Sequence, residues 1–452
     1  MESFEMTLFP RITISGARGI IGNDLTVENA QRMAWAYARF IEGGAIVLGQ
    51  DARQSGRLFH HAVISGLMAG GADVIDVGPA PTPTVGIMIR ELQAKGGVAI
   101  TASHNPSQWN ALKFFAADGT FPESDFVDNY ITFLHRGDYN HVAWDEIPTY
   151  ETNSSALQTH CRSVLSAIDC RKIHERKFHV VVDGCRSVGG IFLPHLLARL
   201  NCTVITLDCV PDGNFTRGME PTPNHLTALM QLVSAEQADL GFAVDPDADR
   251  LAVVSNEGKA IGEEFTLALS TYAALKRVPG GAVVTNLSSS LLNDHAAKQF
   301  GGRVIRTPIG EANVVRGIRD HNAVIGGEGN GGVMYPAVHI GRDALTGAAL
   351  ILQLLAESGK SVSEIVSEFP HYVILKDKVE MDLRQAHKKL ETIAAMPHEE
   401  ELDIRDGVKI IYDNAWLHIR CSNTEPIVRI IAEAEGEEKT RKFIEQGKTW
   451  LS

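Results

Sequence analysis

Short apolar runs alternate with amphipathic segments along most of the chain, and a glycine-rich or polar turn follows each run. These runs predict strands at residues 45–48, 97–101, 178–182 and 282–285. The segment that starts at the N-cap candidate Thr26 has apolar residues at helical spacing and stops before Gly43, which predicts a helix. Strands that alternate with helices predict parallel sheets covered on both faces, and therefore an α/β fold.

The C-terminal part of the chain has a different pattern. Residues 408–412, 415–420 and 427–432 read as strands without helices between them, and residues 437–451 read as a helix. This order predicts a small α+β domain at the end of the chain. The length of 452 residues alone corresponds to about three domains of ordinary size.

Composition and charge narrow the class of protein. Hydrophobic residues make up 44% and charged residues 21% of the chain, as in an ordinary globular protein. The formal charge of −13 argues against a nucleic-acid surface, which needs clustered Lys and Arg. No apolar run approaches the roughly 20 residues of a membrane helix, so we expect no membrane association. Six cysteines without a C-x-x-C pair predict free thiols in a cytoplasmic protein.

The hydroxyl group of Ser103 is the first candidate for a catalytic group. Ser103 lies in the sequence Thr-Ala-Ser-His-Asn-Pro directly after a predicted strand, and Asn105-Pro106 favours a turn. A serine held on such a turn can accept and donate a phosphoryl group when nearby charge is neutralised. Lys113 could supply that charge or move a proton. A polar loop without chemistry, followed by a surface lysine, explains the same residues.

Three aspartates form the second candidate. Asp245, Asp247 and Asp249 follow an apolar run, and alternate residues of an extended backbone point the same way. Three convergent carboxylates favour a hard cation such as magnesium or calcium. An EF-hand does not fit, because Arg250 and Asn256 stand where that loop needs Gly and Glu. A solvated acidic turn is the alternative, but the apolar flanks argue for burial.

Two further polar loops could bind a ligand. Residues 326–332 are rich in glycine, which allows close approach of the backbone, and Glu328 could accept hydrogen bonds from sugar hydroxyls. Residues 420–426 place hydroxyl, amide and guanidinium donors in one turn, with Arg429 soon after, as in a phosphate site. A flexible turn and a polar β-turn are the structural alternatives. No P-loop is present to bind a nucleotide.

Together, these four segments resemble the α-D-phosphohexomutase superfamily, the phosphoglucomutases and phosphomannomutases. Residues 101–106 look like its phosphoserine loop, 245–250 like its metal loop, 327–331 like its sugar loop and 420–426 like its phosphate loop, in the family's order. Residues 14–19 and 49–56 also look like segments of that family. The resemblance covers essentially the whole chain.

The resemblance implies three similar α/β domains and a smaller C-terminal α+β domain around a central active-site cleft. The expected boundaries are 1–150, 151–255, 256–368 and 369–452. Phosphorylated Ser103 would give its phosphate to a hexose or hexosamine monophosphate and take it back from the resulting 1,6-bisphosphate. The chain would act as a monomer or a homodimer.

The resemblance also implies a role for each site residue. Mg²⁺ would be held by the three aspartates and the phosphate on Ser103, and proton transfer or charge stabilisation would fall to Lys113, Arg18 and His104. The substrate would be bound by a larger set, comprising Arg250, Glu328, Asn330, Arg420, Ser422, Asn423, Thr424 and Arg429.

Two positions depart from the family pattern. Asn330-Gly331-Gly332 stands where many members have Ser-Gly-His, which leaves His104 and His339 as candidates for the base. Ala111 stands where glycine is common. The Gly-Glu-Gly-Asn-Gly-Gly form looks most like an archaeal-type branch that acts on glucosamine, mannose or glucose phosphates, and we lean towards glucosamine phosphate.

Two other functions remain open at this point. Asp245-Pro-Asp resembles the start of an aspartate-nucleophile phosphatase, which would release phosphate and tolerate Ser103→Ala. A non-catalytic sugar-phosphate sensor would bind the ligand without turnover.

Overall fold

A computed structural model describes residues 9–137, 139–422 and 426–452. The described chain forms two compact units. The first unit extends to Glu263 and includes Gly332–Val362, and the second consists of Glu264–Gly331 and Ser363–Ser452.

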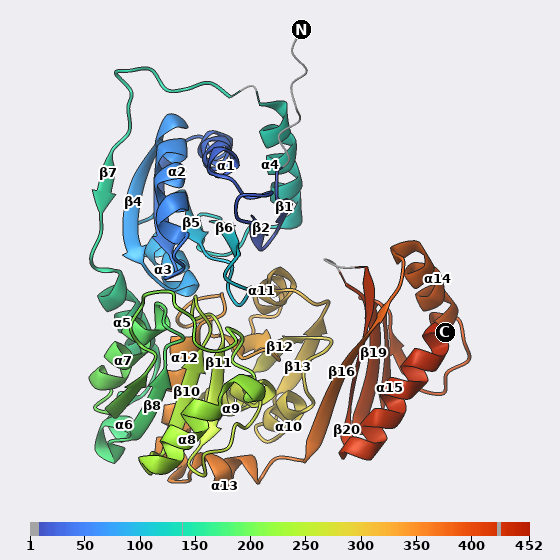
Figure 1. The fold of residues 1–452 in the computed structure, drawn as a ribbon. Coiled ribbons are helices and arrows are strands. Elements are labelled where there is room, and N and C mark those ends of the chain that lie inside the picture. The colour runs from blue at the N-terminus through green and yellow to red at the C-terminus, as the bar shows by residue number, and fades with distance from the viewer. Residues whose placement is uncertain (1–8, 138, 423–425) are drawn as a thin grey trace. The chain divides into compact units, whose positions relative to one another are not determined.

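The first unit contains a seven-stranded sheet in the order β1-β2-β6-β5-β3-β4-β7 (Figure 1). Strands β3, β4, β5 and β7 are parallel, but β6 pairs antiparallel with β5 and with β2. The prediction of parallel sheets does not hold at this edge, because a loop without a helix joins β5 to β6 and cannot make a parallel crossover. The bounds are β1 Arg11–Thr13, β2 Gly16–Ile20, β3 Gly44–Gln50, β4 Ala72–Pro79, β5 Gly96–Ile100, β6 Trp109–Phe115 and β7 Tyr150–Thr152.

Four helices flank this sheet. The predicted first helix is confirmed as α1, because the Thr26 side chain accepts a hydrogen bond from the backbone of Asn29 in a capping box. Helices α1, α2 and α4 share one apolar core with the sheet, whereas α3 contacts β3 and β5. The bounds are α1 Val27–Phe40, α2 Gly56–Ala69, α3 Thr82–Glu91 and α4 Ser124–Arg136.

A four-stranded sheet in the order β11-β10-β8-β9 completes the core of the first unit. Strands β8, β9 and β10 are parallel, and β11 returns antiparallel after a tight turn. Helix α12 packs against α5, α6 and α7. The bounds are β8 His179–Asp183, β9 Thr203–Leu207, β10 Leu240–Val244, β11 Leu251–Ser255, β15 Gly332–Met334, α5 Ala156–Ala167, α6 Cys170–Arg176, α7 Gly189–Arg199, η1 Pro223–His225, α8 Thr227–Ala235 and α12 Ala344–Ser358.

The second unit begins with a parallel arrangement in which β12 pairs with β13 on one side and β14 on the other. Helix α11 contacts all three strands, and α10 contacts β13. The bounds are α9 Glu263–Arg277, β12 Ala282–Asn286, α10 Leu292–Lys298, β13 Arg303–Thr307, α11 Glu311–Asp320, β14 Ile325–Glu328 and α13 Val362–Val366.

The C-terminal part of the second unit is a five-stranded antiparallel sheet in the order β16-β20-β19-β18-β17 (Figure 1). Two helices, α14 and α15, share one apolar core with this sheet. The bounds are β16 Tyr372–Glu380, α14 Leu383–Ala394, β17 Glu401–Asp403, β18 Val408–Tyr412, β19 Ala415–Cys421, β20 Ile427–Glu435 and α15 Glu437–Leu451. The α/β class with a smaller C-terminal α+β domain is confirmed, although β16 and α14 were not predicted. Within the described ranges, no helix is both long and apolar enough to cross a membrane.

Candidate functional site

Ser103, in the loop between β5 and β6, has an unusual backbone conformation. Ser103 has a φ of +50°, a left-handed conformation that side-chain-bearing residues rarely adopt. Its backbone N–H donates to the Thr101 hydroxyl at 2.9 Å, and that hydroxyl donates to Asp51 at 2.6 Å. Ser103 is only 3% exposed. A strained residue held by buried hydrogen bonds is typical of a functional position.

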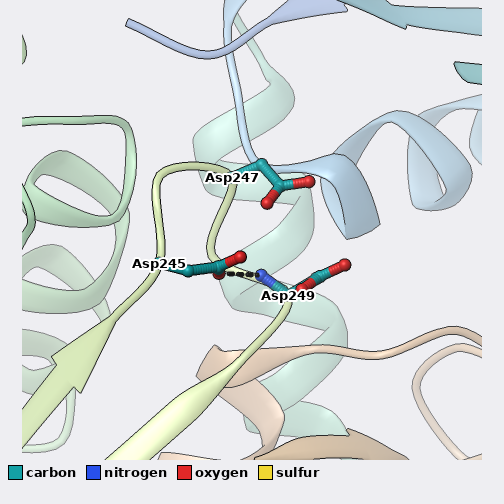
Figure 2. A group of neighbouring side chains, drawn as sticks. All are labelled: Asp245, Asp247 and Asp249. Carbon is teal, nitrogen blue, oxygen red and sulfur yellow. Dashed lines mark hydrogen bonds between the residues drawn. The ribbon is translucent and has the colours of Figure 1, made fainter. Parts of the chain in front are cut away.

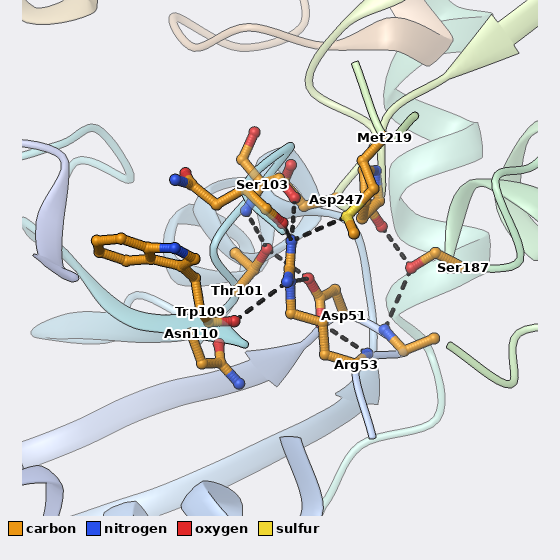
Figure 3. A network of polar contacts seen from close by, with 12 residues as sticks. Asp51, Arg53, Thr101, Ser103, Trp109, Asn110, Ser187, Met219 and Asp247 are labelled. Carbon is orange, nitrogen blue, oxygen red and sulfur yellow. Dashed lines mark hydrogen bonds and ion pairs between the residues drawn. The ribbon is translucent and has the colours of Figure 1, made fainter. Parts of the chain in front are cut away.

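The Arg53 side chain binds the backbone of the serine loop (Figure 3). Its guanidinium donates to the backbone carbonyl oxygens of Ser103 at 2.5 Å and of Asn105 at 2.6 Å. It also donates to the carbonyl oxygens of Pro106 and Trp109, each at 3.1 Å. The Asp51 carboxylate accepts from Arg53 Nε at 3.2 Å. Arg53 thus fixes the backbone that carries the serine, a role that the sequence did not indicate.

We expect Arg53→Met to impair both turnover and stability. The variant leaves Asp51 buried without its cation and frees four carbonyl groups of the serine loop. The free energy of unfolding should fall by about 3 kcal/mol, and turnover should fall about 100-fold because the serine is misplaced. Denaturant unfolding and steady-state kinetics measure the two effects. Arg57→Met, at an exposed position of α2, is the matched control, and equal behaviour of the two variants would contradict the assigned role.

The three predicted aspartates converge on one point in the turn between β10 and β11 (Figure 2). Each offers a carboxylate oxygen, and these three oxygens lie within 4.8 Å of one another. The segment is a turn with Ala248 at a φ of +51°, and not the extended backbone from which convergence was expected. Asp245 Oδ1 accepts from the backbone N–H groups of Asp249 and Arg250, both at 3.1 Å, and this closes the turn.

Each of two cations neutralises one oxygen of an aspartate. Lys113 Nζ lies 2.6 Å from Asp247 Oδ2, and the Arg342 guanidinium lies 2.7 Å from Asp249 Oδ2. The other oxygen of each carboxylate, Oδ1, is buried and has no hydrogen-bond partner within the described chain. Buried polar atoms are nearly always satisfied, so these two oxygens are suited to a cation. Arg342 was not among the predicted site residues.

The charges of the turn also favour a cation. Burial raises the pKa of Asp245 well above its usual range, and the neighbouring Asp247 and Asp249 raise it further. Burial opposes the ionisation of Asp247 as well, but the charge of Lys113 and the hydrogen bonds with Asp245, Lys113 and Thr82 together lower the pKa of that carboxyl. Three buried carboxylates with oxygen-only donors fit a hard divalent ion.

The Ser103 hydroxyl is directly connected to the aspartates. Ser103 Oγ donates to Asp245 Oδ2 at 2.8 Å, so the hydroxyl and the candidate metal ligands form one site. His104 Nδ1 lies 3.2 Å from Ser103 Oγ. Burial lowers the pKa of His104 to about 2, and Arg250 and Arg18 contribute. This ring is therefore neutral at physiological pH.

Of the remaining predicted residues of the first unit, Arg18 and Arg250 lie near the serine loop, whereas His339 lies against α3. Arg18 donates to the Asn105 side chain at 2.6 Å, and Arg250 donates to Glu220 at 2.6 Å. His339, the other candidate base, is buried, lies close to Gly86 and Gly341, and has a pKa lowered to about 3 by burial.

In the second unit, Glu328 stands at the end of β14 and is 6% exposed. Its carboxylate accepts from Asn286 Nδ2 at 3.0 Å. The next residue, Gly329, has no room for a side chain, because a Cβ atom there would lie 2.0 Å from Glu264 Oε1. The loop that contains Asn330 then turns through Gly331, at a φ of +86°.

The predicted phosphate loop lies after β19. Arg420 is buried, and its Nε donates to Asp406 at 3.1 Å. The backbone N–H of Ser422 donates to the carbonyl oxygen of Ile427 at 2.9 Å, which starts the return into β20, where Arg429 is exposed. Asn423 and Thr424 lie outside the described residues.

Four family descriptions match successive parts of the chain. They are phosphoglucomutase/phosphomannomutase alpha/beta/alpha domain I at residues 12–137, domain II at 158–258, domain III at 262–372, and the C-terminal domain at 373–446.

Relatives of similar length match almost the whole chain. A phosphoglucomutase/phosphomannomutase of Thermococcus kodakarensis is 37% identical and covers 96% of each chain. A probable phosphoglucosamine mutase of Methanopyrus kandleri is 36% identical over 95% of each chain. The crystal structure of a phosphoglucomutase/phosphomannomutase family protein from Burkholderia thailandensis shares the fold, with a TM-score of 0.87 at 24% identity over 99% of this chain and 98% of its own.

Proposed function

The chain belongs to the phosphoglucomutase/phosphomannomutase family, and from this premise we propose that Ser103 carries the phosphoryl group in its reaction. The chain is a phosphohexomutase, an isomerase that moves a phosphate within a sugar phosphate. One observation carries the assignment of Ser103: its buried hydroxyl donates directly to Asp245, one of three convergent aspartates.

The reaction takes place in two phosphoryl transfers. In the first, a sugar hydroxyl attacks the phosphorus of phosphorylated Ser103; the new P–O bond forms as the P–Oγ bond breaks, and a 1,6-bisphosphate results. In the second, Ser103 Oγ attacks the other phosphate, and the sugar oxygen leaves. Each attacking hydroxyl loses one proton and each leaving oxygen gains one, so both transfers balance.

Lys113, Arg18 and His104 are the groups that we propose for proton transfer and charge stabilisation. Lys113 lies against Asp247 at the floor of the site, which supports a role in holding positive charge beside the serine. Arg18 is tied to Asn105 of the serine loop. His104 Nδ1 is within hydrogen-bond distance of Ser103 Oγ, and burial lowers the pKa of His104 so that its ring is neutral and can orient this hydroxyl.

We propose Mg²⁺ as the ion of this site, with Asp245, Asp247, Asp249 and the phosphate on Ser103 as ligands. The buried Oδ1 atoms of Asp247 and Asp249, which accept no hydrogen bond within the described chain, support this assignment. Bound Mg²⁺ would supply positive charge against the phosphate oxygens. The chain itself contributes the aspartate geometry, which Lys113 and Arg342 fix through the opposite carboxylate oxygens.

The substrate residues follow from the family assignment. We propose that Glu328 and Asn330 bind sugar hydroxyls and that the phosphate not being transferred is held by a group comprising Arg250, Arg420, Ser422, Asn423, Thr424 and Arg429. Glucosamine phosphate is our preferred substrate, supported by the name of the Methanopyrus relative, whereas that of the Thermococcus relative favours glucose and mannose phosphates. We also propose that the chain has four domains, with limits at 1–150, 151–255, 256–368 and 369–452. We propose a cytoplasmic location for it.

Phosphorus NMR of the purified protein with Mg²⁺ tests this function. Glucosamine 6-phosphate, mannose 1-phosphate and glucose 1-phosphate are offered separately, each with a trace of its 1,6-bisphosphate. We expect isomerisation without release of inorganic phosphate, fastest with glucosamine 6-phosphate. Net release of phosphate would instead indicate a phosphatase, and binding without turnover on all three sugars would indicate a sensor.

A further inference from the structure

Two helices of the first unit begin at the aspartate turn, the turn at residues 245–250 that carries the three aspartates. Thr82, the first residue of α3, donates its backbone N–H to the carbonyl oxygen of Asp247 at 3.0 Å and its hydroxyl to the Asp247 carboxylate. Ala344, the first residue of α12, donates its backbone N–H to the carbonyl oxygen of Ala248 at 3.2 Å. The first residues of both helices therefore hold the aspartate turn.

His160 of α5 connects these two helices to each other. Its Nδ1 atom lies 2.8 Å from the hydroxyl oxygen of Thr84 on α3, and its Nε2 atom lies 3.0 Å from the carboxylate of Asp343, the N-cap of α12. Nε2–H donates to the carboxylate, and the Thr84 hydroxyl can either donate to Nδ1 or accept from it, so both bonds form whether or not the ring is protonated. His160 and Thr84 are fully buried and Asp343 is 1% exposed, which shields both bonds from water.

The carboxylate of Asp343 extends this connection to the aspartate turn. It accepts from the backbone N–H of Leu345 at 3.0 Å and so caps α12. The preceding residue, Arg342, places its guanidinium 2.7 Å from Asp249 Oδ2. A displacement of Asp343 would therefore shift both the first turn of α12 and the cation that holds Asp249.

Residues that hold the ligands of a metal ion matter nearly as much as the ligands themselves. Ligating carboxylates are oriented by hydrogen bonds from neighbouring groups, and loss of such contacts typically lowers metal affinity or activity about 10- to 100-fold. Thr82 contacts Asp247 in this way, and Arg342 contacts Asp249. Their separation depends on how α3 and α12 are placed relative to each other, and His160 bonds to both helices.

We propose that His160 is a positioning residue of the aspartate turn. By connecting α3 to α12, it keeps Thr82 and Arg342 in place to orient the two carboxylates that they contact. This inference rests on the proposed function and extends the metal site to a residue of α5, outside the four sequence motifs. His160 acts through other residues, because both of its ring nitrogens already have partners.

Substitutions at position 160 test the two bonds separately. The side-chain amide of Gln can replace Nε2 towards Asp343, and the shorter side chain of Asn can replace Nδ1 towards Thr84, whereas Leu replaces neither. The readout is the Kd of Mg²⁺ from titration calorimetry without sugar, with equal phosphorylation of Ser103 verified by mass spectrometry. We expect the Kd to rise about 10- to 100-fold for His160→Leu, and less for His160→Gln and His160→Asn, which each retain one bond.

Kinetics and the sign of the effect distinguish positioning from loss of charge. The Mg²⁺ concentration for half-maximal turnover should rise by the same factor as the Kd, with kcat at saturating Mg²⁺ within about threefold, because no group that touches the substrate is removed. All three variants keep Lys113 and Arg342, so they should weaken cation binding, whereas removal of a cation beside the aspartates would strengthen it. An unchanged or lower Kd in all three variants would overturn the proposal.

Val164→Ala is the matched control for loosened packing. Val164 is buried on α5, one turn after His160 and on the same side of the helix. Its truncation leaves a cavity but removes no hydrogen bond, so the melting temperature should fall while the Kd of Mg²⁺ stays within about twofold. An equal rise of the Kd in Val164→Ala and His160→Leu would show that any loosening of α5 weakens the site, and the positioning role would be wrong.

Thr84→Val keeps the test decisive if His160→Leu does not fold. It has nearly the same shape as the wild-type side chain and removes only the bond between His160 and α3. The Kd of Mg²⁺ should rise several-fold, and an unchanged Kd would count against the proposal.

The positioning role and the proposed function can fail independently. If the wild type isomerises a sugar phosphate and every His160 variant matches it in the Kd of Mg²⁺, the positioning role is wrong and the function stands. If the wild type binds Mg²⁺ but isomerises none of the three sugars, the function is wrong, and the Kd values still decide on His160.

A wild type that binds no Mg²⁺ would show the metal assignment to be wrong. Unfolding in EDTA then decides on His160, through His160→Gln, Arg342→Met and the double variant. Coupled residues lose stability non-additively, so non-additive losses support the positioning role and additive losses overturn it.

Discussion

Ser103→Ala is expected to abolish isomerisation of every sugar phosphate that the wild type accepts. The variant lacks the oxygen to which the phosphoryl group is transferred, while the Asp245 carboxylate that accepts its hydrogen bond remains. Loss of a covalent nucleophile typically costs about 10⁴- to 10⁶-fold in turnover. Phosphorus NMR with Mg²⁺ and added 1,6-bisphosphate measures the residual rate, and mass spectrometry should find no phosphate on the variant.

Ser107→Ala is the matched control for this experiment. Ser107 lies on the same loop, is exposed, and differs from Ser103 in having no bond to the aspartates. Its replacement should leave turnover within about twofold, as for ordinary surface positions. Isomerisation by Ser103→Ala at the wild-type rate would remove Ser103 from the reaction, and phosphate release by both proteins would favour the phosphatase.

Lys113→Met is expected to give the second-largest effect, on both activity and stability. The Lys113 ammonium is buried, 2.6 Å from Asp247 and 3.9 Å from Asp249. Without it, the aspartates keep their mutual repulsion and Asp247 loses its nearest cation, which should lower the free energy of unfolding in EDTA by about 3–5 kcal/mol. Turnover should fall about 10²- to 10⁴-fold, the range for loss of a group that transfers protons.

The effect of added Mg²⁺ on the melting temperature of Lys113→Met tests whether the ion binds at the three aspartates. Removal of a positive charge beside Asp247 increases the affinity of the site for a cation, and a ligand of the native state stabilises in proportion to its occupancy. Mg²⁺ should therefore raise the melting temperature of Lys113→Met more than that of the wild type. Lys95→Met, at an exposed lysine before β5, should respond like the wild type. An equal or smaller response of Lys113→Met would place the ion elsewhere.

Much of the fold follows from local pattern. The helix from Thr26, the strands at residues 45–48, 178–182 and 282–285 and the final helix all occur where periodicity and capping predicted them. The antiparallel edge of the first sheet was not predicted. Its cause is the short loop between β5 and β6, and a strand pattern alone does not state whether the next strand returns beside it or crosses over.

The candidate site was predictable only in part. Ser103, the three aspartates and Lys113 were selected because their residue types and neighbours carry chemistry, and the structure brings them together in the first unit. Arg53 and Arg342 were not selected. Each is a single cation in an ordinary segment, and its significance depends on a partner far along the chain, such as Asp249, which is 93 residues from Arg342.

Sequence pattern therefore predicts the α/β class, the C-terminal α+β domain and the residue types that can carry phosphoryl chemistry. These depend on the spacing of apolar residues and on turn residues, which act over a few neighbouring positions. Only the tertiary structure shows which oxygen of Asp247 and of Asp249 is paired with Lys113 or Arg342, and which oxygen is buried and accepts no hydrogen bond within the described chain. Those arrangements depend on strand register and chain reversal, because a buried charge takes its partner from whatever segment the fold packs against it.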